Sequence, residues 1–207
     1  MPEHVVPKPR RRGRPRGGET GTRERILTSA VEEFGEQGYD GATIRGIAAR
    51  AGVDSALVHH YFGTKADLFA EAIGAPMRPD VDVPALLAGP RDELGEHIVR
   101  YVLEMWERPE VRKRGVALFR HALGNRLTTP LVAGFLSREL IGKVAAELGT
   151  PDAELRASLV ASQVAGLLIA RHVLKLPALA SASVDELVAW AAPNVQRYLT
   201  ADSPGAS

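Results

Sequence analysis

The stretch DSALVHHYFGTK, residues 54–65, combines small and polar aromatic side chains in a pattern that suits contact with DNA. Val58 and Phe62 are four residues apart, so both can face inward on one helix. The outer face would then carry Ser55, Ala56, Leu57, His60 and Tyr61. Packing alone does not require three polar aromatic residues in succession at 59–61, whereas contacts with phosphates or base edges would account for them.

A shorter predicted helix precedes this stretch. Thr43 is a suitable N-cap for a helix that runs to about Arg50, and Asp54 is a suitable N-cap for the next one. Between them lies AGVD, where Gly52 can adopt the left-handed conformation. Two short helices joined by a glycine turn form either a plain helical hairpin or a helix-turn-helix, and the exposed residue types favour the second.

A second group of residues with its own chemistry is RRRGRPRGG, residues 10–18, in which glycine and proline interrupt a run of arginines. The arginines are Arg10, Arg11, Arg12, Arg14 and Arg16. Glycine lets a backbone approach the floor of the minor groove, proline keeps the chain extended, and arginine is attracted by the negative potential there. The core Arg-Gly-Arg-Pro resembles an AT-hook, which implies binding to A·T-rich DNA. The alternative is a solvated tail that only aids solubility.

Charge is distributed unevenly along the chain, although the formal net charge is only +1. Residues 1–23 contain seven Lys or Arg and two Glu, a net of +5, whereas residues 24–75 contain four basic and eight acidic residues, a net of −4. A basic block on an otherwise neutral protein indicates a polyanionic partner, most often nucleic acid. Because the acidic helical unit has few side chains that hydrogen-bond base edges, the basic stretch is expected to assist DNA binding.

Several chemistries are excluded or lack a motif. The sequence has no cysteine, which excludes disulfides, thiolate metal sites and cysteine nucleophiles. The histidines have no metal-ligand spacing, and HExxH, GxSxG, P-loop and GxGxxG motifs are missing, so we expect no enzyme, cofactor or metal. No signal peptide is recognised, and the apolar stretch 157–170 is too short and too polar to span a bilayer. A cytoplasmic protein without a membrane partner is expected.

The rest of the chain predicts helices only, and therefore an all-α fold. One face of a helix that Thr22 would cap and Gly38 would end is formed by Ile26, Leu27, Ala30, Val31 and Phe34. A fourth helix is predicted at 65–74, followed by a connecting segment at 75–90 with four prolines. Further helices are predicted near 92–108, 111–125, 130–148, 152–175 and 184–199, and Pro193 is expected to kink or break the last of these.

Residues 22–73, with IAARAGVDSALVHHYFGTKADL at their centre, resemble the N-terminal domain of TetR-family transcriptional regulators. This resemblance implies a three-helix helix-turn-helix DNA-binding domain at 22–75 and a C-terminal helical ligand-binding and dimerisation domain at 76–200. A disordered basic arm, 1–21, would precede them and a disordered tail, 201–207, would follow.

The resemblance also assigns contacts with DNA. The implied positions are Thr43, Arg45, Ser55, Ala56, Leu57, His59, His60, Tyr61 and Lys65. Thr43 and Lys65 would contact phosphates, residues 55–57 would read bases, residues 59–61 would approach the backbone, and Arg45 would reach a base edge or a phosphate. Two positions depart from the family pattern: Gly46 replaces a common acidic residue, and His59 replaces a common tyrosine.

A recognition helix that reads one half-site usually works in a two-fold dimer, and the last two long helices are the best candidates for the interface. The residues expected there are Leu159, Gln163, Gly166, Leu167, Leu187 and Trp190. An effector pocket is expected among the helices of 92–148. Its candidate residues are Tyr101, Met105, Trp106, Phe119, His121 and Phe135. Ordinary core packing is the alternative for both sets.

Together these features predict a homodimeric regulator, most often a repressor, that binds a palindromic double-stranded DNA operator and is released by a small-molecule effector. Three alternatives remain from the sequence: an activator of the same family, an architectural protein that coats DNA, and a helical small-molecule-binding protein without DNA activity.

Overall fold

The computed structural model describes residues 17–126, 128–150 and 152–203, and helices are the regular secondary structure found there, which confirms the all-α prediction. The N-terminal helices are α1 (Gly17–Gly41), α2 (Ile44–Ala51), α3 (Ser55–Phe62) and α4 (Lys65–Ala72). The remaining helices are α5 (Pro79–Leu87), α6 (Leu94–Glu107), α7 (Pro109–Gly124), α8 (Thr128–Leu136), α9 (Gly142–Leu148), α10 (Ala153–Leu168), α11 (Pro177–Ser181) and α12 (Val184–Thr200). Two π-helical turns, η1 (Ser137–Ile141) and η2 (Ile169–Val173), join α8 to α9 and extend α10.

Helix α1 begins at Gly17, five residues before the predicted cap at Thr22. Adding residues to an existing helix costs much less than nucleating one, so the helix continues past a suitable cap residue. The predicted arm boundary is therefore wrong for residues 17–21, which are helical. The predicted end at Gly38 is confirmed, because its φ of 74° and ψ of 173° interrupt the helical backbone.

The short helices of the N-terminal domain are fixed by side chains at their ends. The Thr43 hydroxyl accepts a hydrogen bond from Gly46 N (3.0 Å), and the Asp54 carboxylate accepts one from Ala56 N (2.7 Å). Gly52 ends α2 in the left-handed conformation, with φ 66° and ψ 41°. These features confirm the predicted caps and turn, and they set the angle at which α3 leaves α2.

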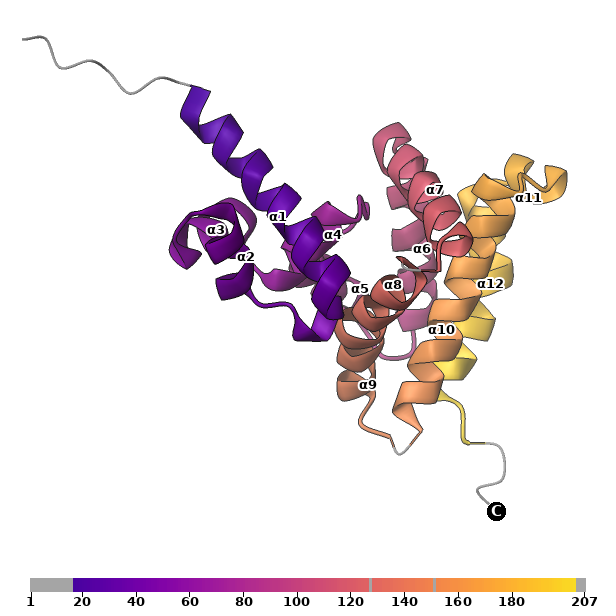
Figure 1. Cartoon of the computed structure of the whole chain (residues 1–207). Helices are drawn as coiled ribbons and strands as arrows, with labels where there is room; N and C mark the ends of the chain where they lie inside the picture. Colours follow the sequence, from indigo (N-terminus) through magenta and orange to yellow (C-terminus); the bar gives the residue numbers. More distant parts are fainter. Residues whose placement is uncertain (1–16, 127, 151, 204–207) are drawn as a thin grey trace, which may run out of the picture.

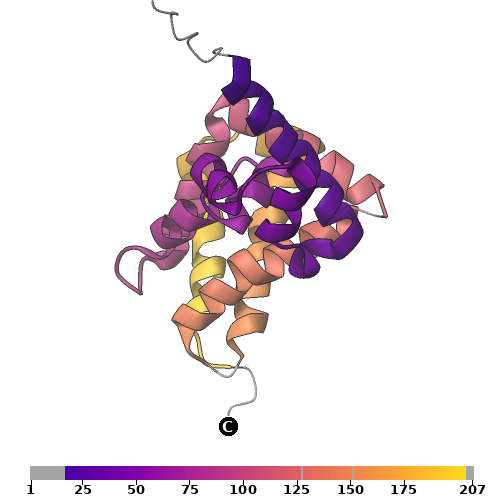
Figure 2. The same cartoon turned by 60° about the vertical axis from the view of Figure 1, so that its left-hand side comes forward.

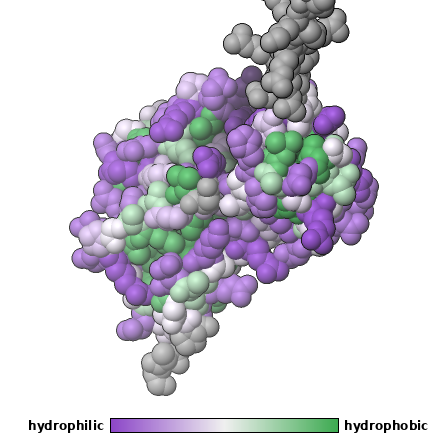
Figure 3. Space-filling model, turned by 90° about the vertical axis from the view of Figure 1, so that its left-hand side faces the viewer, coloured by the Kyte–Doolittle hydropathy of each residue, from purple (hydrophilic) through white to green (hydrophobic). Residues whose placement is uncertain are grey.

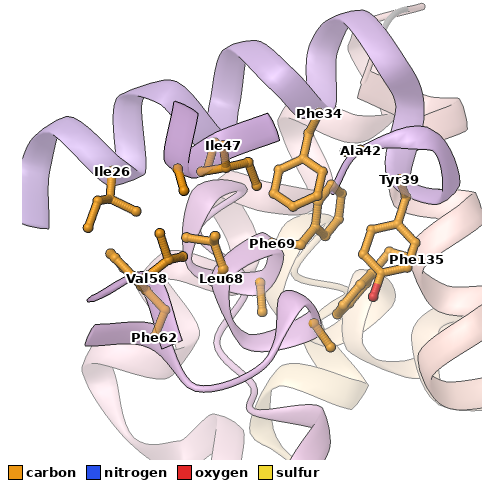
Figure 4. Close-up of a cluster of buried hydrophobic side chains, with 14 of the residues drawn as sticks. Ile26, Phe34, Tyr39, Ala42, Ile47, Val58, Phe62, Leu68, Phe69 and Phe135 are labelled. Carbon is orange, nitrogen blue, oxygen red and sulfur yellow. The ribbon is translucent and has the colours of Figure 1, made fainter. Parts of the chain in front are cut away.

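The N-terminal core joins α1–α4 to Phe135 of α8 (Figure 4), and the partly buried Leu118, Leu131 and Leu136 also pack against it. Its fully buried members include Ile26, Phe34, Ile47, Val58, Leu68 and Phe69. Phe135 of α8 enters this core, with its ring centroid 4.9 Å from that of Phe69 and 5.5 Å from that of Tyr39. The two halves of the chain therefore share a hydrophobic contact instead of meeting only through a linker.

A second core holds the C-terminal helices together, with α10 and α12 side by side at the end of the molecule opposite α1–α3 (Figures 1 and 2). Helix α6 packs against α12 most closely at Gly95, where an added Cβ would lie 2.6 Å from both Ala192 O and Gln196 N. Gly95 N also donates a hydrogen bond to Gln196 Oε1 (2.7 Å). Only glycine permits this approach of the two backbones.

The segment 75–90, predicted to be a connection, contains helix α5. Pro79 occupies its first position, where the missing N–H has no partner in a helix anyway. Asp82 Oδ2 accepts a hydrogen bond from Arg78 N (2.5 Å), which satisfies a donor that precedes the first turn. Val83 and Leu86 are buried, and this burial outweighs the hydrogen bond lost at Pro84.

Helix α12 runs through Pro193 without ending there, so the predicted break is wrong. Ser183 and Glu186 form a capping box at its start, and Ala192 and Val195 are buried on either side of the exposed proline. The predicted tail also begins later than residue 201, because Ser203 Oγ donates a hydrogen bond to Asp152 Oδ2 (2.6 Å).

Helix α10 together with η2 is 21 residues long, Ala153–Val173, and is apolar enough by length and composition to cross a membrane. The stretch 157–170, predicted to be too short and too polar to span a bilayer, is the middle part of this helix. In the structure this helix contacts α9 and α12, and Ala157, Val160 and Leu168 are buried. These contacts are those of a core helix of a folded domain.

We predict that Gly95→Ala lowers the free energy of unfolding by about 1 to 3 kcal/mol, because the methyl group must enter space that the α12 backbone occupies. Gly35→Ala is the matched control, since nothing lies within 4 Å of an added Cβ in that helix. It should raise stability by about 0.5–1 kcal/mol. Urea unfolding at equal protein concentration measures both, and a neutral Gly95→Ala would contradict this packing.

Candidate DNA-binding site and effector cavity

Helix α3 lies at one end of the molecule and presents its outer face to solvent. Figure 3 looks onto this end, where hydrophilic residues surround a smaller apolar area. Val58 and Phe62 are buried, as predicted, whereas Ala56, His59 and His60 are exposed. Ser55 and Leu57 are half-buried at the start of the helix. The exposed face therefore combines apolar groups at its first turn with imidazoles further along.

Tyr61 differs from its predicted outward position. Its side chain is half-buried and packs against the N-terminal core, with its ring centroid 5.5 Å from that of His60. A residue three positions from Val58 and one from Phe62 lies at the edge of the buried stripe on a helix. Tyr61 thus supports the position of His60 more than it extends the exposed surface.

At the start of α2, Thr43 and Arg45 are both exposed. The Thr43 hydroxyl already serves as the N-cap acceptor, which leaves its own proton available to a phosphate oxygen. Arg45 forms no ion pair within the part of the chain that the structure describes. Its guanidinium is therefore available for a phosphate or a base edge.

His59 and Lys65 are already engaged by the protein. His59 Nδ1 lies 2.8 Å from Gly63 O at the end of α3, which directs Nε2 away from the helix terminus. Lys65 Nζ donates to Asp40 O (3.3 Å) and lies 4.8 Å from the centroid of the Tyr39 ring. Partial burial lowers the pKa of Lys65. A phosphate contact by Lys65, as the sequence predicts, requires the side chain to leave this position.

Arg50 joins α2 to α1 through three glutamates that the sequence analysis did not connect with it. Its guanidinium contacts Glu36 (2.6 Å), Glu33 (3.3 Å) and Glu32 (3.5 Å). The hydrogen bond from Arg50 lowers the pKa of Glu36. This group accounts for part of the negative charge of residues 24–75, while α2 and α3 themselves contain no acidic residue.

Gly46, one of the two departures from the family pattern, makes room for this group. An added Cβ at this position would lie 2.2 Å from Glu33 Oε1 and 3.2 Å from Thr43 Oγ1. Glycine in a helix interior lowers helix stability, so the space given to Glu33 is the structural compensation. The arginines Arg10, Arg11, Arg12, Arg14 and Arg16 lie outside the described residues.

A cavity of about 220 Å³ lies between α5, α6, α7, α8, α9 and α10. Five predicted pocket residues line it: Tyr101, Met105, Trp106, Phe119 and Phe135. His121 does not, because it is exposed on α7. Two residues along an α-helix correspond to about 200° of rotation, so Phe119 and His121 face opposite sides.

One carboxylate interrupts the apolar wall of the cavity. Asp82 of α5 accepts a hydrogen bond from the Tyr101 hydroxyl (2.6 Å) through Oδ1 and one from Arg78 N through Oδ2. Burial and this hydrogen bond raise the pKa of Tyr101 to about 12. Asp82 was not predicted from the sequence because it lies between Pro79 and Pro84, in a segment predicted to be a connection without a helix.

Trp106 of α6 stacks with two other rings. The centroid of its indole lies 5.6 Å from that of Phe119 and 5.4 Å from that of His172. Gly115 of α7 leaves space for the indole, since an added Cβ would lie 2.2 Å from a ring atom. Burial lowers the pKa of His172, which keeps its imidazole neutral beside the indole. Trp106 therefore forms a rigid part of the cavity wall.

Phe135 belongs to two structures at once, because it lines the cavity and is buried in the N-terminal core. Polar contacts surround this junction. The Tyr39 hydroxyl donates to Glu139 Oε1 (2.6 Å), and Arg138 Nε donates to Asp40 Oδ1 (2.9 Å). Burial and the hydrogen bond to Glu139 raise the pKa of Tyr39. The cavity wall and the core of α1–α4 therefore share the side chain of Phe135.

The outer face of α10 and α12 carries exposed apolar groups. Trp190 is 83% exposed and Leu159 is 37% exposed, and Gly166 is also on the surface. Gln163 and Leu167 are half-buried. Leu187 was expected in the interface but is only 6% exposed, because it packs in the C-terminal core. Its neighbours at helical spacing, Ala191 and Val195, are buried on the same face of α12.

Comparisons with known proteins agree with this arrangement. Residues 26–72 match the family described as "Bacterial regulatory proteins, tetR family", and residues 92–199 match "Tetracyclin repressor-like, C-terminal domain". The HTH-type transcriptional regulator BetI of Agrobacterium fabrum is 31% identical over 175 residues, which are 80% of this chain and 84% of that protein. An HTH-type transcriptional repressor of Streptomyces coelicolor is 40% identical over 68 residues, 28% of this chain and 35% of that protein.

Among solved structures, a TetR-family regulator from Streptomyces coelicolor is similar, with 36% sequence identity and a TM-score of 0.46. That match covers 90% of this chain and 99% of the other. The family matches span the helix-turn-helix and the helices from α6 to α12, including the α10–α12 face, whereas α5 with Asp82 lies between the two matched ranges. The chain therefore belongs to the TetR family of DNA-binding transcriptional regulators.

Proposed function

We propose that this protein is a ligand-responsive repressor that acts in the cytoplasm, binds a palindromic operator as a homodimer and is released by a small-molecule effector. The observation that carries the proposal is the double role of Phe135, which lines an apolar cavity and packs inside the DNA-binding domain. A ligand that changes the position of this ring changes the packing of α1 and α4, which hold α2 and α3 in place.

The mechanism is a shift between two arrangements. In the DNA-binding state the two recognition helices of a dimer are spaced to enter adjacent major grooves. A ligand that binds the cavity more tightly in another state increases the population of that state, and only this difference in affinity drives release. The exposed face of α10 and α12, with Trp190 and Leu159, is the surface we assign to the dimer.

Selection of bound sequences from a random DNA pool tests the proposed function. The full chain should select an inverted repeat whose half-sites are one helical turn apart or a multiple of it. A chain that starts at Gly17 tests the arm: if residues 1–16 bind the minor groove, only the full chain selects A·T-rich flanks, and its salt dependence is steeper by about 0.9 per phosphate contacted. Selection of no common sequence would indicate an architectural DNA-coating protein and refute the repressor.

Arg45→Ala should lower operator affinity by about tenfold, because the exposed guanidinium supplies a charged contact from the start of α2. A phosphate contact predicts a smaller salt slope, whereas a base contact predicts relaxed sequence preference at one position. Arg120→Ala is the control, since Arg120 is an exposed arginine on α7, outside both the helix-turn-helix and the α10–α12 face. Equal affinity of both variants, measured by fluorescence anisotropy, would remove Arg45 from the interface.

Trp190→Glu should convert the dimer into a monomer at micromolar concentration, because it places a charge in the centre of the apolar α10–α12 face. The dimer dissociation constant is expected to rise by at least about tenfold. Val31→Glu is the control: Val31 is 52% exposed on α1, far along the chain from this face. Sedimentation equilibrium measures both variants, and an unchanged Trp190→Glu dimer would place the interface elsewhere.

Phe135→Leu should uncouple the cavity from DNA while operator binding is retained. Trp106 and Trp190 are the two tryptophans of the chain, so Trp190→Phe leaves Trp106 as the fluorescent reporter of the cavity. Because coupling between sites is reciprocal, addition of operator duplex should change Trp106 emission. The change should be reduced in Phe135→Leu and kept in Val164→Ala, which alters the cavity wall away from the N-terminal core. An equal change in both variants would refute the role of Phe135.

A further inference from the structure

The cavity has an apolar wall with a single charge. Among the described residues that line it, Asp82 is the only one with a formal charge, and lysine, arginine and histidine are missing from that set. Aromatic rings and aliphatic groups from five or more helices supply the rest of the wall. A ligand that fills this space must therefore bury an apolar body and place some group beside one carboxylate.

The protein does not neutralise this carboxylate. Asp82 forms no ion pair with any side chain that the structure describes, and its two hydrogen bonds come from a neutral hydroxyl and a backbone N–H. Arg108 is close enough to act on the Tyr101 hydroxyl, yet it makes no contact with Asp82. A carboxylate has about four lone-pair positions, so acceptor capacity remains after these two bonds.

Asp82 is half-buried at the apolar wall, so its charge is only partly hydrated and a group of opposite charge compensates for the lost hydration. A cation placed at Asp82 gains a charge-assisted hydrogen bond beside apolar side chains that exclude part of the water. A carboxylate or phosphate on the ligand would meet like charge in the same surroundings. The cavity is therefore complementary to a positive charge attached to an apolar body.

We infer that the effector is a small lipophilic organic cation, in the simplest case a protonated amine, whose charged group binds Asp82 beside Tyr101. This inference rests on the proposed function, since it names the class of ligand for the same cavity. The volume of about 220 Å³ limits the apolar part to roughly one ring with a short chain. The arrangement selects for charge through Asp82 and for size through the rigid wall at Trp106.

Three probes with the same apolar body test the inference: phenylbutylamine, phenylbutanol and phenylbutanoate. Binding to the full chain is measured at neutral pH by Trp106 fluorescence in the Trp190→Phe background. The amine should bind about tenfold or more tightly than the alcohol, and the carboxylate more weakly than the alcohol. This comparison needs no change at the cavity, because its one substitution, Trp190→Phe, is on the exposed face of α12.

Asp82→Asn then removes the charge while it keeps an oxygen that can accept from Tyr101. The preference for amine over alcohol should disappear, and binding of the alcohol should remain. Glu104→Gln is the matched control, because Glu104 is an exposed carboxylate on α6 outside the cavity lining. The preference should be unchanged in that variant.

The outcomes separate this inference from the proposed function. If the amine and the alcohol bind equally, or Asp82→Asn keeps the preference, the assignment of a cationic ligand is overturned while the cavity remains a binding site. If none of the three probes binds, the cavity is not an effector site and the inference falls with it. If the amine binds at Asp82 but leaves operator affinity unchanged, the ligand class stands and the proposed release of DNA is refuted.

Discussion

The position of α1–α4 depends on one aromatic contact across the chain. Phe135 comes from α8, yet its ring lies against Tyr39 and Phe69 inside the N-terminal core. Aromatic pairs in such edge-on and tilted arrangements add stabilisation beyond the area they bury. The ring also faces the cavity, as do Leu118 and Leu136, which pack against the same core. These shared side chains form the boundary between the N-terminal core and the cavity. Hydrogen bonds of Glu139 with Tyr39 and of Arg138 with Asp40 also connect η1 to α1 beside this contact.

Helices α2 and α3 are only eight residues each, too short to be stable alone. Their geometry is imposed from outside, by caps at Thr43 and Asp54, by burial of Val58 and Phe62, and by the attachment of Arg50 to α1. The surface salt bridges of Arg50 contribute little to stability individually, but together they restrict where α2 can lie. On the outer face of α3, the side chains of Ala56 and His60 are exposed and are not part of the core. The helix-turn-helix is thus positioned by buried side chains, by Arg50 and by two caps, of which Thr43 is also a predicted phosphate contact.

Local signals predicted much of this fold. Caps and glycine turns act within a few residues, so Thr43, Gly52 and Asp54 were identified correctly, as were the buried Val58 and Phe62. The failures share a cause, because tertiary packing overrides local preference. Helix α5 and the continuous α12 contain Pro84 and Pro193, and both prolines are tolerated since neighbouring residues are buried. Five of the six residues predicted to line the cavity do so, but residue type could not tell which side of α7 His121 would face. Asp82 and the partners of Arg50 depend on long-range contacts that no spacing reveals.

The contact between α6 and α12 bears on which parts of the molecule are free to move. With Gly95 against the α12 backbone and Gln196 bonded to Gly95 N, these two helices cannot slide along each other without a clash. They form a fixed frame that also carries the exposed Trp190. A rearrangement of the cavity is therefore easier at its other walls, chiefly α5 and the π-helical turn that follows Phe135. If the surface of α10 and α12 is the dimer interface, as we propose, such a rearrangement would alter the angle of α1–α4 without changing the contact between subunits.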